Sequence, residues 1–534
     1  MNRDNLLKSP AFHAALLFCL YAFLFMEVYA RFFKGGVSYE FCHYGEIGRN
    51  IAQGKGFRTG VVFPATLAVF ERKGISFTPE SPVFARFPLY AYAVGASERI
   101  FGSGDFQVAL VNGAVVSFAS ALLYWIVAQS APAWTGLLAS IFLFFCPSIL
   151  RGFALWGYPD LLFCLLVLLL NYGVVFGAWP PFALGLLGGA AWAARSNFML
   201  WLPVYAVWIF WKSSGRRGRA CALFLGGFLF AAFPYAYYLC RHFGGVVNPN
   251  FLWNLANGVL IPDLAWNHYR LFHFSEILPA LWNPLLKKGL FGFMDFFRNL
   301  PALWQCGFLW GPYFLSFFAP KDRAWRNWQQ LYGILLGVQL FFFVFLRQES
   351  IGPFVSGRYY LWYAPALMAG AAQGFRDLPV YVNKKTWSAL CFSLVLGHAF
   401  LWSSYYAKKD PGFGHPSGLP VQNWPEMEFL REEAESGSVV LTNIPAQVGW
   451  YAGQRAVQLP YEWEDVPKIE AASRLDYIFV TTLTAGEFGR FPQWQKILTS
   501  PDERRAFCAR FGYAPHRVYA NGLLLKKLSL SSKK

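Results

Sequence analysis

Residues 38–57 read SYEFCHYGEIGRNIAQGKGF, and the rest of the chain is organised around this stretch, which directly follows the first long apolar run. Ser38 is suited to cap the N-terminus of a helix, and Gly54 and Gly56 are suited to end it. The stretch therefore predicts a short helix. At helical spacing, one face of this helix carries Glu40, His43, Tyr44 and Ile47, and another carries Glu46, Arg49, Asn50 and Gln53.

Glu40 stands in the first turn of the predicted helix. The positive end of the helix dipole lies there, and it favours the ionised form of a carboxyl group. An ionised carboxylate is the form that accepts a proton, so Glu40 is a candidate general base.

The composition is that of a membrane protein with many spanning helices. Hydrophobic residues make up 56% of the 534 residues and charged residues 14%, whereas soluble proteins carry about 25% charged residues. The formal net charge is +17, but the basic residues fall largely in short loops between apolar segments. This distribution follows the positive-inside rule and argues against nucleic acid as a partner. The nine cysteines show no CxxC spacing, so we expect no disulfide framework and no cysteine metal site.

The apolar runs predict a mostly α-helical polytopic membrane protein with about eleven transmembrane helices. The candidate segments are 11–33, 106–130, 133–149, 159–178, 181–195, 198–213, 219–240, 302–320, 329–346, 358–376 and 386–405. With the N-terminus inside, the basic loops around 212–219, 321–326 and 376–385 all fall in the cytoplasm. The same count places the helix at 38–53 on the outer membrane face, and it also places outside the segments 34–105, 150–158, 241–301, 347–357 and 406–534.

The composition changes after about residue 406, which divides the chain into a membrane part, 1–405, and a C-terminal part, 406–534. A linker rich in glycine and proline comes first. Strand-like runs follow at 438–442 and 476–481 among charged helical segments, and 515–526 has the pattern of a hairpin. We therefore expect a small extracytoplasmic α/β domain at the C-terminus.

The run Glu40-Phe41-Cys42-His43-Tyr44-Gly45-Glu46-Ile47-Gly48-Arg49 resembles the opening of the first outer loop in the C-type (GT-C) integral-membrane glycosyltransferases. In the branch of the lipid A aminoarabinose transferases and protein mannosyltransferases, this loop reads acid-x-x-basic-Tyr-x-Glu-Ile-x-Arg. Here Glu40 replaces the usual Asp, Phe41 replaces a second acid, and His43 stands where Arg is common. The resemblance implies a GT-C fold, with Glu40 as a catalytic residue. It also implies that substrate is bound by His43, Tyr44, Glu46 and Arg49.

The same resemblance points to four further residues and to a lid. Arg86 stands at the basic position of a Lys/Arg-Pro-Pro-Leu-Tyr motif in loop 34–105, with Phe87 in place of the first proline. Asp160 heads the fourth candidate helix, where the family has an acid, and Arg195 and Arg358 stand where the family has basic residues. Helix capping is the alternative role for Asp160, and anchoring at the membrane interface is the alternative for the arginines. In the family, the loop that corresponds to 241–301 closes over the lipid-linked donor, so this segment is a candidate lid.

These residue types suit the transfer of a sugar from a polyprenyl phosphate. Breaking the glycosidic bond builds negative charge on the phosphate, and the available cations are Arg86, Arg195, Arg358 and His43. Glu40 would take the proton of the acceptor, and a single displacement would invert the anomeric carbon. Asp160 could orient the acceptor, or hold a divalent metal ion together with Glu40. The sequence requires no cofactor.

We therefore expect a multi-pass enzyme of the bacterial inner membrane that transfers a sugar from a polyprenyl-phosphate-linked donor on the periplasmic side. The acceptor stays open among a glycolipid, a polysaccharide and a protein. A transporter or flippase of the lipid-linked sugar is one alternative, although no internal repeat is visible and the candidate charges gather at one face. A GT-C homologue that binds the lipid without catalysis is the other, because Phe41 stands where a second acid is usual.

Overall fold

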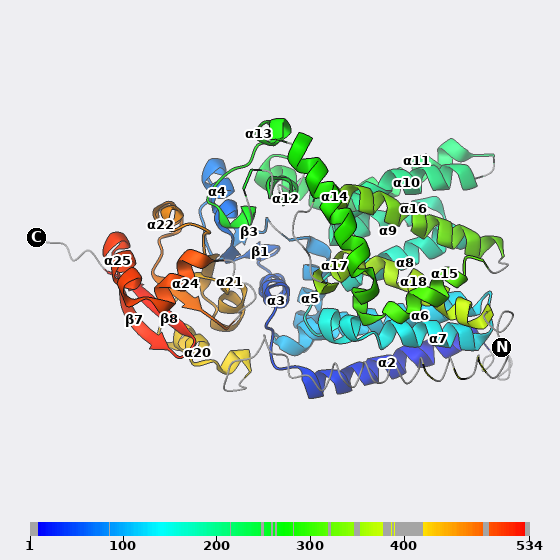
Figure 1. The fold of residues 1–534 in the computed structure, drawn as a ribbon, viewed down its shortest axis with the longest axis horizontal. Helices are drawn as coiled ribbons and strands as arrows, with labels where there is room; N and C mark the ends of the chain where they lie inside the picture. The colour runs from blue at the N-terminus through cyan, green and yellow to red at the C-terminus, as the bar shows by residue number, and fades with distance from the viewer. Residues whose placement is uncertain are drawn as a thin grey trace, which may run out of the picture.

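The chain folds into a body of long helices with a mixed β-sheet at one end (Figure 1). The structure is a computed structural model. It describes residues 9–528 apart from 85, 214, 247–249, 258–259, 262–263, 281, 319–321, 347–352, 378–385, 387–388, 390–392, 394–419 and 484–490.

The apolar runs of the sequence form the helical body. Among the described residues, three helices are long and apolar enough to cross a membrane: α2 (Pro10–Phe32), α6 (Asp105–Ala128) and α11 (Arg217–Phe243). A fourth span is added if α7 (Ala133–Phe144) and the π-helix η1 (Ser148–Ala154), which are bent by 45° at their junction, cross together. The other apolar helices of the body are α8 (Asp160–Phe176), α9 (Pro181–Ala194), α10 (Phe198–Lys212), α16 (Arg323–Leu346) and α18 (Ala364–Asp377). The chain is thus a multi-pass membrane protein, but a count of eleven spans is not confirmed.

One expected span, 302–320, is not a continuous helix. It forms the 3-10 turns η4 (Leu300–Gln305) and η5 (Gly307–Leu309), followed by the short helix α15 (Trp310–Leu315). Trp304 interrupts the helical path with a φ of 52°, and its indole N–H donates to the Gly357 carbonyl oxygen at 2.8 Å. The described part of this segment is therefore a series of short helical pieces, with Leu303 and Leu309 buried and Phe314 and Phe318 exposed.

The expected helix at 358–376 is divided as well. It begins earlier as α17 (Pro353–Tyr360), passes through the turn η6 (Leu361–Tyr363), and continues as α18. Pro365 follows the break, and proline lacks the N–H that a continuous helix would need. The last expected span, 386–405, falls almost wholly outside the described residues.

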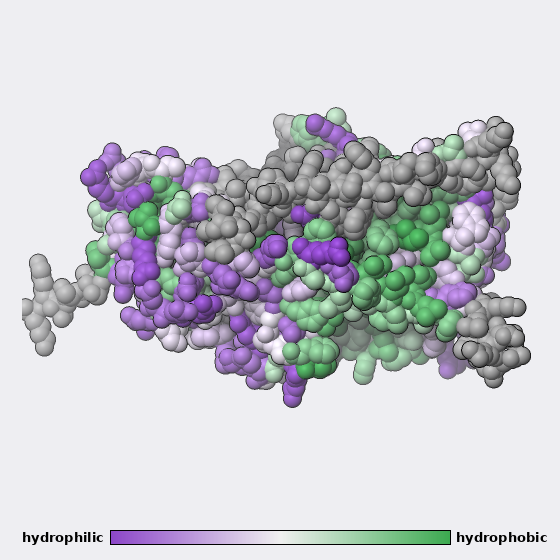
Figure 2. Space-filling model, turned by 90° about the horizontal axis from the view of Figure 1, so that it is seen from below, coloured by the Kyte–Doolittle hydropathy of each residue, from purple (hydrophilic) through white to green (hydrophobic). Residues whose placement is uncertain are grey.

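On the face shown in Figure 2, hydrophobic residues gather over the coloured part of the helical body, and hydrophilic residues gather over the end that carries the sheet. Large apolar side chains on α11 are exposed by more than half their surface, among them Leu229, Phe230 and Phe233. Such a surface is costly in water and suits contact with lipid tails.

Helices α9 and α11 pack with their backbones in contact. A Cβ atom placed on Gly185 would lie 2.0 Å from the Phe224 carbonyl oxygen, and one on Gly227 would lie 2.2 Å from the Phe182 carbonyl oxygen. Small residues allow this close approach in pairs of membrane helices. The contact fixes the direction of α9, which ends directly before Arg195.

The sheet joins the C-terminal part of the chain to a strand from the segment that follows α3 (Tyr39–Ala52). Its six strands lie in the order β2 (Val61–Val62), β5 (Arg455–Gln458), β4 (Val439–Thr442), β6 (Tyr477–Thr481), β8 (Gly522–Lys527) and β7 (Tyr513–Tyr519). The first four are parallel to one another, and β8 and β7 are antiparallel to their neighbours. The strands expected at 438–442 and 476–481 and the terminal hairpin are confirmed, whereas β2 was not foreseen. The division of domains at 405/406 stays a prediction.

Helices from the C-terminal part accompany this sheet. They are α20 (Pro425–Glu432), α21 (Pro445–Gln447), α22 (Val466–Ser473), α24 (Pro492–Thr499) and α25 (Pro501–Phe511), with a π-helical turn, η9 (Val448–Ala452), after α21.

The segment expected to act as a lid contains α12 (Asn250–Ala256), α13 (Phe274–Ile277) and α14 (Trp282–Asn299). Helix α14 crosses the helical body at an angle (Figure 1), and the ring of Phe296 lies 4.9 Å from that of Tyr360 in α17. Before it, the Tyr269 backbone N–H donates to the Asp465 carboxylate in the C-terminal part. The segment thus spans both parts of the molecule, and its action as a lid stays a prediction.

Candidate active site

Helix α3 (Tyr39–Ala52) carries the first acid of the site and begins and ends where local signals predict. The Ser38 hydroxyl accepts from the Phe41 backbone N–H at 3.0 Å and donates to the Trp156 carbonyl oxygen at 2.7 Å. Gly54 and Gly56 follow the helix with positive φ angles of 80°. The helix is buried on nearly all sides between the helical body and the sheet, and so it is not a half-exposed surface helix. This packing positions Glu40 rigidly.

Five charged side chains from five segments form one ionic cluster, which consists of Arg86, Glu40, Arg358, Asp160 and Arg195. Arg358 lies at its centre, where Nη2 donates to Glu40 Oε1 at 2.8 Å and Nε donates to Asp160 Oδ2 at 2.9 Å. Arg86 Nη1 lies 3.1 Å from Glu40 Oε2, and Arg195 donates to Asp160 Oδ1. The predicted catalytic pair and the three predicted phosphate-binding arginines are therefore brought together.

The segments that supply these residues all end or begin at the cluster. Asp160 is the first residue of α8, Arg195 directly follows α9, and Arg358 lies in α17. Arg86 precedes α5 (Pro88–Phe101), which packs on α3 so closely that a Cβ atom on Gly48 would lie 2.5 Å from a Val94 methyl group. The site is thus built by helix ends that converge.

The cluster carries an excess positive charge. Its three guanidinium groups outnumber its two carboxylates by one, and the side chains of Arg86 and Arg358 are only 15% and 16% exposed. Aromatic rings line the arginines: the guanidinium carbon of Arg358 lies 4.5 Å from the Tyr158 ring centre, and that of Arg86 lies 4.9 Å from the Tyr39 ring centre. A partly dehydrated positive site of this kind attracts an anion strongly.

Glu40 is ionised in this environment. Burial alone would raise the pKa of Glu40, but Arg86 and Arg358 outweigh it and lower the pKa to about 2. Its two oxygens differ, because Oε1 accepts a hydrogen bond from Arg358 while Oε2 faces Arg86 only as an ion pair. Within the described part of the chain, Oε2 accepts no hydrogen bond. Oε2 is thus a buried carboxylate oxygen whose nearest charged partner is Arg86.

His43 and Tyr44, two of the predicted substrate-binding residues, border the cluster. His43 Nδ1 accepts from Arg86 Nε at 3.1 Å, and burial followed by the charge of Arg86 holds the pKa of His43 well below its usual range. This environment favours the neutral form of His43, and its expected use as a cation stays a prediction. The Tyr44 ring centre lies 5.8 Å from the Arg86 guanidinium carbon and packs edge-on against Tyr90. Contact of either residue with substrate stays a prediction.

Glu46 and Arg49, on the other face of α3, make contacts away from the cluster. Glu46 accepts hydrogen bonds from the Thr59 hydroxyl, the Asn50 amide and the Gly60 backbone N–H, at 2.7, 2.9 and 2.9 Å. Arg49 donates to the carbonyl oxygens of Gly449 and Trp450 and stacks on the Trp450 ring at 4.6 Å. Glu46 thus orders the loop after α3, and Arg49 joins α3 to the C-terminal part. Their binding of substrate stays a prediction.

Sequence reasoning missed Thr59 and Tyr158. Thr59 links His43 to Glu46 from the two-residue strand β1 (Arg58–Thr59), which is too short for a local sequence signal to mark it. Tyr158 packs under Arg358, and its place two residues before Asp160 was the signal that could have identified it.

A divalent metal does not fit the cluster as it stands. The carboxylates of Glu40 and Asp160 face three guanidinium groups, which would repel a dication. Among the described residues, no group of three or more His, Cys, Asp or Glu side chains could hold a metal. Magnesium can be held by one or two carboxylates together with phosphate oxygens and water, so it is the charge of the three arginines that disfavours a metal ion here.

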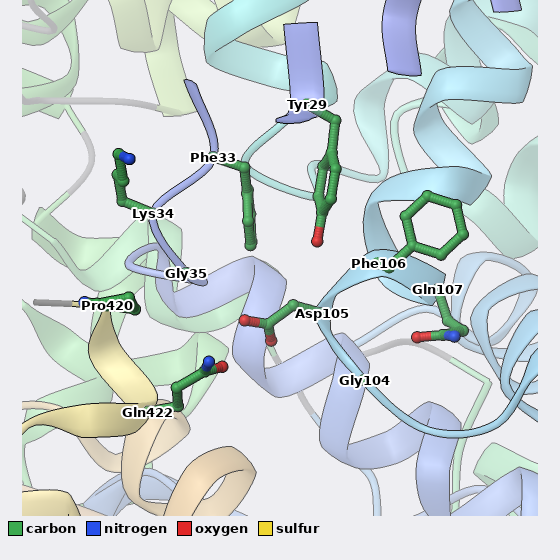
Figure 3. Close-up of a pocket in the computed structure, with 10 residues that line it drawn as sticks. All are labelled: Tyr29, Phe33, Lys34, Gly35, Gly104, Asp105, Phe106, Gln107, Pro420 and Gln422. Carbon is green, nitrogen blue, oxygen red and sulfur yellow. The ribbon is translucent and has the colours of Figure 1, made fainter. Parts of the chain in front are cut away.

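Two cavities lie elsewhere in the molecule. One of about 270 Å³ lies where the end of α2, the start of α6 and residues 420–422 meet, and Figure 3 shows Asp105 and Lys34 among its lining side chains. The other, of about 1200 Å³, lies between the ends of α8 and α10 and the start of α16 and is lined by Lys212, Arg323 and Arg326. No member of the ionic cluster lines either cavity.

No protein-family model matches the sequence, and no curated protein matches it. Solved structures with a similar fold include the following two. ArnT from Cupriavidus metallidurans, bound to undecaprenyl phosphate, aligns over 97% of this chain and 98% of its own, with a TM-score of 0.55 and 13% identity. The Archaeoglobus fulgidus oligosaccharyltransferase, tethered to an acceptor peptide, aligns over 96% of this chain and 74% of its own, with a TM-score of 0.52 and 11% identity. Both neighbours are GT-C glycosyltransferases, and the chain therefore has the GT-C fold.

Proposed function

We propose that this protein is a membrane glycosyltransferase that moves a sugar from a polyprenyl-phosphate-linked donor to an acceptor hydroxyl. The ionic cluster is the observation that carries this proposal, because a GT-C fold brings three arginines and two carboxylates to one place. The likeness to ArnT, whose structure holds undecaprenyl phosphate, supports a polyprenyl phosphate as the lipid carrier.

The arginines would bind the donor phosphate. A phosphodiester carries one negative charge, which matches the single excess positive charge of the cluster. Release of the sugar leaves a phosphate monoester, whose charge at neutral pH is about −1.5 to −2. The same guanidinium groups therefore bind the leaving group more strongly than the intact donor, which is the condition for lowering the barrier.

Glu40 would act as the general base, with Oε2 as the oxygen that takes the proton. A carboxylate with a pKa of about 2 is a weak base. When the phosphate recruits Arg86 and Arg358, Glu40 loses the ion pairs that lower its pKa, and so it becomes a stronger base. Binding of the donor would thus activate the base. Asp160 would keep Arg358 and Arg195 in place through the contacts described above.

In the proposed reaction, the acceptor oxygen forms a bond to the anomeric carbon while the bond from that carbon to the phosphate oxygen breaks. The bonding electron pair leaves with the phosphate, and the proton of the acceptor passes to Glu40. A single displacement of this kind inverts the anomeric configuration.

We infer that the site faces the periplasm of a bacterial inner membrane. Lys212 at the end of α10 and Arg323 at the start of α16 line one cavity, so their helix ends meet at one end of the body. That end lies away from the sheet (Figure 1). Under the positive-inside rule, it is the cytoplasmic end, and the sheet and the cluster then lie outside.

Reconstitution in liposomes with a polyprenyl-phosphate sugar and a panel of acceptors tests this function. We expect wild type to release polyprenyl phosphate and Glu40→Gln to lower this rate by about 10²–10⁴-fold. Glu428→Gln, which removes an exposed carboxylate on α20, is the matched control and should leave the rate unchanged. Binding of the lipid phosphate without release of sugar from any donor would favour a non-catalytic homologue. Movement of the intact donor across the bilayer would favour a flippase.

A further inference from the structure

His43 lies at the middle of a chain of hydrogen bonds that runs from the ionic cluster into the loop after α3. It is 2% exposed. Its Nδ1 lies 3.1 Å from Arg86 Nε, and its Nε2 lies 3.2 Å from Thr59 Oγ1. Thr59 Oγ1 in turn lies 2.7 Å from Glu46 Oε2. The buried imidazole therefore connects the phosphate-binding arginine to the fixed carboxylate of Glu46.

The donors and acceptors along this chain determine the tautomer of His43. A guanidinium group can only donate, so Nδ1 must accept from Arg86 and carries no proton. The single proton of the neutral ring is then on Nε2, which donates to Thr59 Oγ1. The Thr59 hydroxyl donates its own proton to Glu46. Each group thus has one defined role.

This chain also sets the orientation of Arg86. With Nε held by His43, the planar guanidinium group is fixed at one edge, and its Nη1 faces Glu40 Oε2 at 3.1 Å. The guanidinium carbon lies 4.9 Å and 5.8 Å from the ring centres of Tyr39 and Tyr44. Without an acceptor at Nδ1, the buried Nε–H of Arg86 would lose its partner, and the ion pair with Glu40 would be left to orient the guanidinium group.

We propose that His43 is a positioning residue, a neutral hydrogen-bond acceptor that holds Arg86 in the orientation that receives the donor phosphate. It does not bind the phosphate as a cation. This inference rests on the proposed function.

Three variants at this position separate an acceptor from a merely space-filling group. Asn places its side-chain oxygen near the position of Nδ1 and keeps the acceptor, whereas Gln reaches toward the position of Nε2 and Leu keeps only bulk. Since a hydrogen bond to a charged group contributes roughly a tenfold or larger effect, His43→Gln and His43→Leu should weaken binding of undecaprenyl phosphate at least tenfold. His43→Asn should stay within about threefold of wild type. His13→Leu removes a histidine that contacts the Tyr124 hydroxyl in the helical body, and it is the matched control.

Binding would be measured on the full chain in nanodiscs with undecaprenyl phosphate as the probe, beside the thermal unfolding midpoint of each variant. If His43→Leu does not fold, the Asn and Gln variants decide, provided that their midpoints agree. Equal losses in the Asn and Gln variants, or no loss in either, would overturn the inference. Failure of wild type to bind the lipid would instead refute the proposed function, so the two failures are distinguishable. In turnover assays the Gln variant should raise KM more than it lowers kcat, because Arg86 contacts the phosphate before the reaction begins.

Discussion

Replacing Glu40 with Gln should tighten the binding of undecaprenyl phosphate while it lowers turnover by about 10²–10⁴-fold. In the resting site, Glu40 occupies both Arg86 and Arg358, which are the groups proposed to receive the phosphate. An ionised Glu40 therefore competes with the ligand, and it also repels the ligand once the phosphate is bound. A neutral amide of the same shape removes both effects.

The pKa of Glu40 gives the size of this competition. It is lowered from 4.5 to about 2. At ~1.4 kcal/mol for each pKa unit, the site favours the ionised form by about 3 kcal/mol. The Glu40 side chain is 11% exposed, so solvent screens only part of that interaction. If the phosphate gains most of this interaction free energy in Glu40→Gln, the dissociation constant of undecaprenyl phosphate should fall by about 10- to 100-fold.

Calorimetric titration of undecaprenyl phosphate into nanodisc samples of wild type, Glu40→Gln and Glu428→Gln would measure the change. Glu428 is an exposed carboxylate in α20, and its variant should bind as wild type does. If Glu40→Gln binds the lipid as tightly as wild type or more weakly, Arg86 and Arg358 do not change their partner from the Glu40 carboxylate to the phosphate. The base would then have to work without activation by the donor.

Three further predictions concern stability. Because its pKa is lowered, Glu40 contributes stability that is fully present above its unfolded pKa of about 4.5 and is lost as the pH falls toward 2. The difference in thermal unfolding midpoint between wild type and Glu40→Gln should therefore shrink between about pH 5 and pH 3. A difference that stays constant over this range would contradict the lowered pKa. Arg49→Ala removes two hydrogen bonds to the Gly449 and Trp450 carbonyl oxygens and should lower the local free energy of unfolding by about 1–3 kcal/mol. Limited proteolysis should then cleave the C-terminal part faster in Arg49→Ala than in Arg49→Lys. Equal cleavage would count against a role of Arg49 in joining α3 to the C-terminal part. Gly185→Leu should prevent the packing of α9 on α11, because even a Cβ atom at this position would lie 2.0 Å from the Phe224 carbonyl oxygen. Size-exclusion chromatography should show loss of the monodisperse protein. The control, Leu229→Ala on the exposed face of α11, should stay monodisperse.

Local signals in the sequence were enough to predict those helices and strands whose ends are determined by neighbouring residues. The serine cap and the two glycines placed α3, and alternating or continuous apolar runs placed β4, β6 and the terminal hairpin. The count of eleven spans is not confirmed. At 302–320 the apolar run contains a break that its composition does not reveal, because Leu303 and Trp304 leave the helical conformation.

The partners within the site could not be predicted from local pattern. The sequence indicated that Glu40, Asp160 and three arginines belong together, but their pairing depends on contacts such as the one between Glu40 and Arg358, 318 positions apart. Nor does the sequence reveal the charge of His43, because its neutrality comes from burial and from the approach of Arg86. Spacing along one helix predicts which side chains share a face, but it does not predict what lies opposite them.

Strand β2 makes the order of synthesis a constraint on folding. Val61 pairs with Ala456 and Val62 with Val457, so β2 cannot pair until residues almost 400 positions later have been synthesised. During translation, Thr59 and Gly60 are made long before the partner strand of β2 exists, and pairings that distant in sequence form slowly. In a nascent chain this edge of the sheet would therefore stay incomplete until the C-terminal part has been made. A truncation before residue 420 would then fail as a maturation defect, not as the simple loss of a module.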